Sequence, residues 1–264
     1  MTVGNTISSL EIEKHLSDNS RGLQLIVVDE TDSTNDMAKV LSKEGKKRFA
    51  VIAKRQTRGK GRGEHIWASP DGGIYLSLTI ENDLPKRRIP LLNLTLAVAA
   101  AETILQTTGA TVSLKWPNDI YLHGRKLGGI LIESSTGPTD YIVAGIGINL
   151  NSEMESFPPE LREGVSSIYG ETGLFYDPNL FIANLISSIL KWTDITIAES
   201  DRVIDEWSRL SVTLGSRVAF VVGGRTIRGL AVGVDSDGFL MVEDDDTHLT
   251  EKIVSPNILG EVCC

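Results

Sequence analysis

A glycine-rich basic segment is the first part of the sequence whose residue types suggest chemistry. It reads Gln56-Thr57-Arg58-Gly59-Lys60-Gly61-Arg62-Gly63. Alternating glycines let a backbone approach a ligand closely, and the interleaved cations suit phosphate oxygens. A flexible basic hairpin tip is an equal alternative from this segment alone. It is not a Walker loop, because the Gly-Lys-Ser/Thr ending is absent and the segment opens no helix.

A second segment combines a cation, an aromatic ring, a proline and a carboxylate within five residues, Lys115-Trp116-Pro117-Asn118-Asp119. Proline is disfavoured inside a central strand, so we expect a shaped turn at a strand end. A purely structural turn is the alternative, because Pro-Asn-Asp is common in turns. The lysine and the tryptophan favour a functional turn.

Two further segments place unusual residues in apolar strands. Lys126 enters the run Leu127-Gly128-Gly129-Ile130-Leu131-Ile132, so its ammonium must reach solvent or meet an anion. In Ala144-Gly145-Ile146-Gly147-Ile148-Asn149, alternate glycines remove side chains from one strand face. That face has room for a flat ligand, although close packing of a helix on the strand is the alternative.

These four segments, in this order, resemble the biotin protein ligases. The triplet Ser33-Thr34-Asn35, the loop from Gln56 to Trp67 and the Gly-Ile pair before Asn149 fall where that family has them. The resemblance covers about residues 23–254. It does not include the N-terminal DNA-binding domain of the regulatory members, so it implies a ligase-only form.

The resemblance implies a two-step reaction. Biotin and ATP first form biotinyl-5′-adenylate and pyrophosphate, and the activated carboxyl then passes to a lysine of a biotin carboxyl carrier protein. Such chemistry relies on cations and positioning rather than on a covalent enzyme intermediate. The absence of a core cysteine and of a Gly-x-Ser-x-Gly elbow agrees with that expectation.

The resemblance also assigns roles to individual residues. The expected catalytic residues are Lys126, Asp119 and Arg62. Asp119 is expected to hold Mg²⁺ or to orient the incoming lysine. The expected biotin site comprises Ser33, Thr34, Asn35, Gln56, Lys60, Gly61, Arg62, Trp67, Lys126, Gly129, Ile130, Leu131 and Gly145. The expected ATP or adenylate site comprises Lys60, Arg62, Asn118, Asp119, Lys126 and Asn149. Free N–H groups at a helix N-terminus should help to bind the ureido ring.

The loop departs from the family pattern, which is close to Gly-Arg-Gly-Arg-x-Gly-Arg-x-Trp. Lys60 stands in place of an arginine and loses the bidentate fork. Glu64 and His65 stand in place of a glycine and an arginine, which weakens the cationic character of the loop. Residues 252–260 contain no arginine that could face ATP, although Lys252 could substitute.

The elements that must position these residues follow from periodicity and from capping signals. The pattern predicts helices over 7–17, from 32–36 to Gly45, 90–108, 177–198 and 200–209. It predicts strands over 23–28, 49–53, 73–80, 111–115, 120–122, 126–134 and 141–149. Short strands separated by Gly-Gly and Asp-Gly turns follow over 216–222, 225–234, 238–243 and 248–254.

The resulting fold class is α+β. The resemblance implies a catalytic domain like that of class II aminoacyl-tRNA synthetases and biotin/lipoate ligases, with a mixed, mostly antiparallel sheet, and a small C-terminal SH3-like β-barrel. We expect an N-terminal extension over 1–22, the catalytic domain over 23–211 and the barrel over 212–264.

Charge and composition limit the function classes. The 264 residues carry a net charge of −9, which argues against general nucleic-acid binding. Residues 39–62 nevertheless contain ten cations and one acid, so this block alone carries +9. We expect its first half to be a solvated helix face and its second half to meet an adenylate phosphate.

The remaining expectations concern location, partners and competing functions. Cys263 and Cys264 are adjacent, so they cannot join distant parts of the fold. No signal-like or uninterrupted 18-residue apolar run is present, so we expect a cytoplasmic protein without a membrane segment. We expect no DNA binding, and a homodimer is an open alternative. The competing functions are a lipoate or octanoate ligase or transferase of the same fold, and a non-catalytic biotin sensor.

Overall fold

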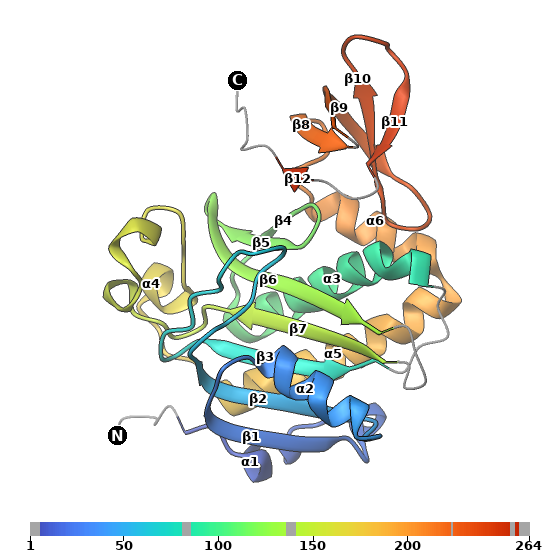
Figure 1. Ribbon diagram of the computed structural model, residues 1–264. Helices are drawn as coiled ribbons and strands as arrows, with labels where there is room; N and C mark the ends of the chain where they lie inside the picture. The colour runs from blue at the N-terminus through green and yellow to red at the C-terminus, as the bar shows by residue number, and fades with distance from the viewer. Residues whose placement is uncertain (1–5, 81–85, 136–140, 223, 254–256, 259–264) are drawn as a thin grey trace.

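The computed structural model describes residues 6–80, 86–135, 141–222, 224–253 and 257–258, so Cys263 and Cys264 lie outside the described residues. Figure 1 shows a large sheet with helices on both faces and a smaller sheet above it. This arrangement confirms the α+β class predicted from the sequence.

The large sheet has seven strands in the spatial order β1-β2-β3-β7-β6-β5-β4. Only the pair β1–β2 is parallel, so the sheet is mixed and mostly antiparallel, as expected. The strands span Gln24–Thr31 (β1), Phe49–Gln56 (β2), Ile74–Thr79 (β3), Ser113–Lys115 (β4), Asp119–Leu122 (β5), Arg125–Ser134 (β6) and Ile142–Ile148 (β7).

The two faces of this sheet bury different clusters. In β2, Ala50 and Ile52 belong to the main core, whereas Phe49 and Val51 belong to a second, smaller cluster. This alternation follows from the two-residue period of a strand. The main core lies under α3 (Ile89–Thr108), α5 (Pro178–Ala198) and α6 (Ser200–Leu210), and the smaller cluster lies under α2 (Thr34–Lys43) (Figure 1).

The smaller sheet has the order β11-β10-β9-β8-β12 and is antiparallel throughout. Its strands span Arg217–Val222 (β8), Arg225–Val234 (β9), Leu240–Asp244 (β10), Thr250–Ile253 (β11) and Asn257–Ile258 (β12). Trp116 lies at its junction with the large sheet. The Trp116 Nε1 donates to the Gly238 carbonyl at 3.2 Å, and the ring meets Phe220 edge-on at 5.7 Å.

The shortest elements differ from the sequence prediction. The helix expected over 7–17 is only Ser9–Glu13 (α1), followed by a 3₁₀ turn at Asp18–Ser20. The prediction also lacked β12, α4 (Ile168–Thr172) and the 3₁₀ turns Lys86–Arg88, Met154–Ser156 and Pro159–Leu161. Elements of two to five residues show too little of the helical or strand period to be recognised.

The helices α3 and α5 are long and apolar enough to cross a membrane by length and composition alone. The sequence prediction of no membrane segment rested on uninterrupted apolar runs, and isolated polar residues interrupt the apolar sequence of both helices. In the structure, 67% of the apolar window of α3 and 56% of that of α5 is buried. The two helices pack on each other and on the sheet, so their apolar character is that of core helices.

Candidate active site

A cavity of about 280 Å³ opens beside α2 on the face of the large sheet opposite α3 and α5. This volume is near the lower end of the range for small-molecule sites. Every residue predicted for the biotin and adenylate sites lines the cavity, except Asn149. Its lining comprises Ser33, Thr34, Asn35, Gln56, Lys60, Gly61, Arg62, His65, Ile66, Trp67, Asn118, Asp119, Lys126, Gly129, Ile130, Leu131, Gly145, Ile146 and Gly147.

Four lining residues were not among the predicted site residues, namely His65, Ile66, Ile146 and Gly147. The sequence held a signal for two of them. His65 was noted as a departure from the family loop, and Gly147 continues the glycine alternation of β7. Ile66 is 82% exposed at the loop tip, which no sequence pattern indicated.

The glycines of β7 and β6 face the protein's own side chains. A Cβ atom added at Gly147 would lie 2.6 Å from the Trp67 indole, and one added at Gly129 would lie 3.2 Å from the same ring. A Cβ at Gly145 would clash with the Asn35 amide oxygen. The indole of Trp67 is therefore the flat group that packs directly against Gly147 and Gly129.

Lys126 reaches the cavity because of a β-bulge. Tyr121 pairs with Lys126 and Ile120 with Gly128, so Leu127 is an extra residue in β6. Without it, strand alternation would turn Lys126 toward the core with Ile130. With it, Lys126 shares a face with Gly129. Its Nζ lies 2.7 Å from Asp119 Oδ1 and 5.6 Å from the centre of the Trp67 ring.

The N-terminus of α2 contributes fewer free donors than predicted. Ser33 caps the helix, and its Oγ accepts the Asp36 N–H at 3.4 Å. The Thr34 N–H and hydroxyl both donate to Gln56 Oε1, at 2.8 and 3.1 Å. Gln56 Nε2 in turn donates to Ser69 at 3.0 Å. The expectation of open N–H groups is corrected, because the glutamine side chain already satisfies the Thr34 N–H.

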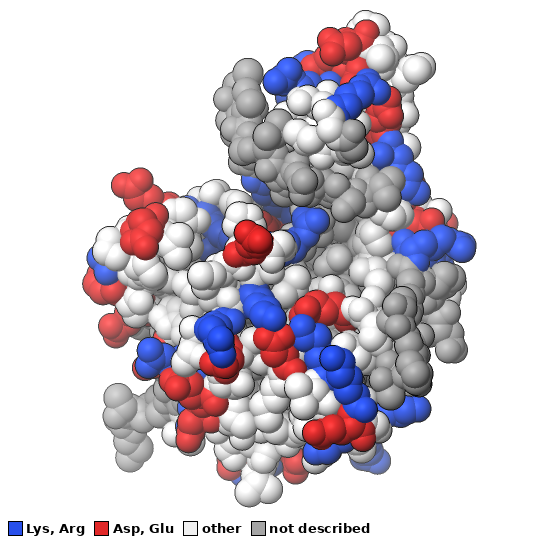
Figure 2. Space-filling view, in the orientation of Figure 1, with Lys and Arg blue, Asp and Glu red and all other residues white. Residues whose placement is uncertain are grey.

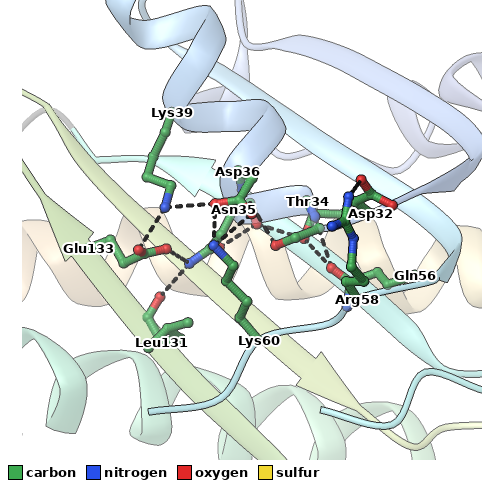
Figure 3. Close-up of polar contacts among 12 residues, drawn as sticks. Asp32, Thr34, Asn35, Asp36, Lys39, Gln56, Arg58, Lys60, Leu131 and Glu133 are labelled. Atoms are coloured by element: carbon green, nitrogen blue, oxygen red, sulfur yellow. Dashed lines mark hydrogen bonds and ion pairs between the residues drawn. The ribbon is translucent and has the colours of Figure 1, made fainter. Parts of the chain in front are cut away.

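The Asn35 amide is fixed by hydrogen bonds to three partners. Its Nδ2 donates to the Leu131 carbonyl at 3.2 Å and to Glu133 at 2.9 Å, and its Oδ1 accepts from Ser77 at 2.6 Å. Glu133 also binds Lys39, at 2.7 Å. Figure 3 shows this network joining α2 to β6. The amide orientation is therefore set by the protein before any ligand arrives.

Two cations of the basic loop are held by carboxylates of α2 and its approach. Arg58 binds Asp32, and Lys60 binds Asp36 at 2.7 Å (Figure 3). Burial acts against the ionised form of Asp36, but hydrogen bonds from Lys39 and Lys60 hold its pKa below its usual range. These pairs fasten the loop across the helix N-terminus.

Arg62 is different from the other cations of the loop. It is half-buried in the cavity lining, and within the described part of the chain it makes no ion pair at contact distance. Burial lowers its pKa, which the charge of Asp119 partly offsets. Desolvated cations without a partner bind anions strongly.

Two further cations of the +9 block, Lys54 and Arg55, are neutralised locally. Lys54 pairs with Asp29, and Arg55 with Glu30, because β1 and β2 lie side by side in parallel register. Figure 2 shows Lys and Arg side chains interleaved with Asp and Glu across the face that carries the cavity. The basic block is therefore not a continuous basic surface on this face.

The residues of the turn at 115–119 point in two directions, toward the smaller sheet and toward the cavity. Trp116 is 5% exposed and points to the smaller sheet. Asn118 and Asp119 line the cavity. The Asn118 Nδ2 donates to the Ile130 carbonyl at 2.6 Å, so this amide fastens the turn to β6. The segment therefore has structural contacts at Trp116 and Asn118, and its functional interpretation, which rests on Asn118 and Asp119 in the lining, stays a prediction.

Asn149 lies buried outside the cavity lining. Its backbone N–H donates to the Leu127 carbonyl at 2.9 Å, and its Nδ2 donates to the Ser166 carbonyl at 2.9 Å. It therefore supports the bulge that presents Lys126. A direct contact of Asn149 with the nucleotide stays a prediction.

Asp119 is the one carboxylate in the cavity lining, and it already binds Lys126. Among the described residues, no group of three or more His, Cys, Asp or Glu side chains is placed to hold a metal ion. Lys252 binds Asp235 at 2.5 Å and lies over the Phe239 ring. Its expected substitution for an ATP-facing arginine stays a prediction.

Comparisons with known proteins agree with this geometry. Residues 27–149 match the model of the biotin/lipoate A/B protein ligase family, and residues 213–257 match that of the biotin protein ligase C-terminal domain. The bifunctional ligase/repressor BirA of Bacillus spizizenii is 30% identical over 96% of this chain and 78% of its own length.

Two further relatives are similar over most of their length. The biotin–[acetyl-CoA-carboxylase] ligase of Paracoccus denitrificans is 30% identical over 80% of this chain and 91% of its own length. The structure of the Aquifex aeolicus biotin protein ligase in complex with biotin and ATP superposes with a TM-score of 0.75. It is 27% identical, and the match covers 88% of this chain and 96% of that one.

Proposed function

The chain belongs to the biotin protein ligase family, and we propose that it is an ATP-dependent ligase that attaches biotin to a lysine of a biotin carboxyl carrier protein. The observation that carries the proposal is the composition of one cavity. It brings the neutral side chains of Ser33, Thr34 and Gln56 together with the cations Arg62 and Lys126 around the Trp67 indole. Biotin combines a neutral polar ring system with a carboxylate, and that set of groups matches both requirements.

The match to a biotin protein ligase C-terminal domain supports biotin rather than lipoate as the substrate. The catalytic-domain model covers both kinds of ligase and does not separate them. We assign the ureido end of biotin to Ser33, Thr34, Asn35 and Gln56. The apolar ring and chain are assigned to Trp67, Gly129, Ile130, Leu131 and Gly145.

In the first step, a biotin carboxylate oxygen attacks the α-phosphorus of ATP. A new P–O bond forms, the α–β bridging bond breaks, and pyrophosphate leaves. Arg62, Lys126 and, after release from Asp36, Lys60 stabilise the negative charge that concentrates on the α-phosphate oxygens. Gly61 allows the loop backbone to approach the phosphate. Asn118 and Asp119 are assigned to the nucleotide side, and Asn149 to supporting Lys126.

In the second step, the carrier lysine amine attacks the carbonyl carbon of the adenylate. An amide bond forms, AMP leaves, and the amine loses a proton. Asp119 is the carboxylate in the lining that could orient the amine or accept its proton. The positive charge of Lys126 in the lining offsets the negative charge of the AMP phosphate as AMP leaves.

Magnesium enters this account as part of the ATP substrate. A single carboxylate does not build a protein metal cage, and Mg²⁺ commonly binds substrate phosphates with one or two carboxylates and waters. Asp119 is the residue that would contribute such a ligand. When bound, the ion would neutralise the leaving pyrophosphate.

The remaining assignments follow from charge and from the family. An acidic chain, with a net charge of −9, is not expected to bind DNA. We place the enzyme in the cytoplasm with its carrier. A homodimer is compatible with the proposal but is not required by it.

Transfer to a carrier tests the proposal. The purified chain is incubated with Mg–ATP, biotin or lipoate, and an unmodified biotin carboxyl carrier domain, and the carrier mass is then measured. We expect the mass increase of one biotin, which requires ATP and is lost when the acceptor lysine is replaced. An increase with lipoate alone would show the lipoate ligase, and binding of biotin without any modification would show the non-catalytic sensor.

A further inference from the structure

The backbone of Lys126 is held from both sides by a segment outside the sheet. The Lys126 N–H donates to the Gly164 carbonyl at 2.9 Å, and the Ser166 N–H donates to the Lys126 carbonyl at 2.8 Å. This segment leads into α4, which Figure 1 places at the end of the sheet where β6 begins. The position of the lysine in the cavity thus depends on the position of residues 164–166.

One carboxylate connects this segment to β6. Glu171 in α4 accepts a hydrogen bond from the Ser166 hydroxyl at 2.7 Å and binds the Arg125 guanidinium. Its second oxygen lies 2.9 Å from His123 Nδ1. The Glu171 side chain is 15% exposed. Hydrogen bonds from His123 and Ser166 lower the pKa of Glu171, so it is ionised at neutral pH.

The three partners of Glu171 are all close to Lys126, either in the sequence or through a hydrogen bond. Arg125 precedes Lys126 in β6, Ser166 is bonded to its carbonyl, and His123 lies in the turn that leads into the strand. Lys126 also lies next to the bulge at Leu127, where the ladder of the sheet is interrupted. A bulged strand end has weaker support from its neighbours, so external contacts set its geometry.

We propose that Glu171 is a positioning residue for catalysis, because it fixes the Lys126 backbone through Ser166 and Arg125. This inference rests on the proposed ligase function and adds a residue that does not line the cavity. Loss of the carboxylate frees the Ser166 hydroxyl and the Arg125 guanidinium, which lets the start of β6 shift relative to Asp119 and Trp67. A displacement of about 1 Å at a reacting group can reduce a rate by about 100-fold.

The test compares Glu171→Ala with Glu102→Ala by steady-state kinetics of biotin-dependent ATP–pyrophosphate exchange. Glu102 is a matched control, because it is a carboxylate of similar exposure that binds Ser188, Lys191 and Trp192 between α3 and α5. We expect Glu171→Ala to reduce kcat about 10-fold to 100-fold, with the KM for biotin changed less than about threefold. Glu102→Ala should lower the unfolding temperature while kcat stays within twofold.

A second measurement separates positioning from general destabilisation. Binding of a non-hydrolysable biotinyl-adenylate analogue is measured by calorimetry for Glu171→Ala, Lys126→Ala and the double variant. If Glu171 acts through Lys126, the double variant should bind no more weakly than Lys126→Ala alone. Glu171→Gln, which keeps an acceptor for Ser166, should recover part of the kcat and serves if the alanine variant does not fold.

Three results would overturn the inference in an active enzyme. They are a kcat of Glu171→Ala within twofold of the parent, an equal loss of kcat in Glu102→Ala, and additive losses of analogue binding in the double variant. An inactive parent chain would instead contradict the proposed function, so the two failures can be told apart.

Discussion

Three strand glycines shape the cavity, because their missing side chains leave space for other residues of the protein. Gly147 and Gly129 leave the space that the Trp67 indole occupies, and Gly145 leaves the space of the Asn35 amide. A bulky ring held against a strand is more rigid than one in solvent. The cavity is thus preorganised by packing on glycines, which lowers the entropy lost when a ligand binds.

Replacing Gly147 by alanine should displace the indole, because the added Cβ would lie 2.6 Å from the ring. We expect the KM for biotin to rise about 10-fold, in keeping with a loss of about 1.4 kcal/mol of binding energy. Gly233→Ala is the control, because this strand glycine has no heavy atom within 4 Å of its added Cβ. Equal KM values for the two variants would contradict the role of Trp67.

Elements position these residues, and the two longest described helices, α3 and α5, pack on each other beneath the sheet. Between the two helices, burial alone would raise the pKa of Glu102, but hydrogen bonds from Lys191, Ser188 and Trp192 lower it below its ordinary value of 4.5. A carboxylate with a depressed pKa stabilises the fold above its unfolded-state pKa and loses this contribution as the pH falls through the folded value.

The free energy of unfolding should therefore depend on Glu102 at neutral pH and not in acid. We expect Glu102→Gln to be less stable than the parent at pH 7 and to approach it as the pH falls below the ordinary value of 4.5, where the unfolded and then the folded carboxylate is protonated. Urea unfolding at both pH values measures the difference. A difference that stays constant between pH 7 and pH 3.5 would refute this account of the helix pair.

The sequence allowed most long elements to be predicted, because their periods extend over several turns or residue pairs. The helix ending at Gly109 and the alternating strand predicted over 73–80 (β3) are examples, and Gly109 does adopt the left-handed cap with φ 73°. The bulge at Leu127 could not be predicted, since it is one extra residue in an otherwise regular apolar run. It nevertheless decides which face of β6 presents Lys126.

The sequence predicted which residues form the candidate site, but it did not predict how those residues contact one another. The local segments named nearly every lining residue, because each segment is continuous in sequence. The satisfied Thr34 N–H, the location of Asn149 and the indole against Gly147 depend on residues far apart in the chain. Such contacts become visible only when the strands are paired.

At the scale of the whole molecule, the two sheets share one hydrophobic core. Phe220, Leu240 and Ile253 of the smaller sheet belong to the same cluster as the helices beneath the large sheet. The Leu91 N–H also donates to the Asp237 carbonyl at 2.9 Å. The boundary proposed near 211–212 therefore separates two sheets that are joined by a continuous apolar interface.

We expect the two parts to unfold together. Phe220→Ala removes the ring that meets Trp116 edge-on, and truncating a buried phenylalanine costs about 3–5 kcal/mol. Calorimetry should give one transition in the parent and one transition at lower temperature in the variant. Two separate transitions in the parent, only one of them moved by the substitution, would contradict a shared core.

Biotin-dependent exchange of labelled pyrophosphate into ATP tests the central claim most directly, because it detects adenylate formation without a carrier. We predict exchange by the parent chain with Mg–ATP and biotin, none without biotin, and none by Lys126→Ala, whose fold should be intact by circular dichroism. Absence of exchange in the folded parent, or undiminished exchange in Lys126→Ala, would contradict the assignment of this cavity as the site of biotin activation.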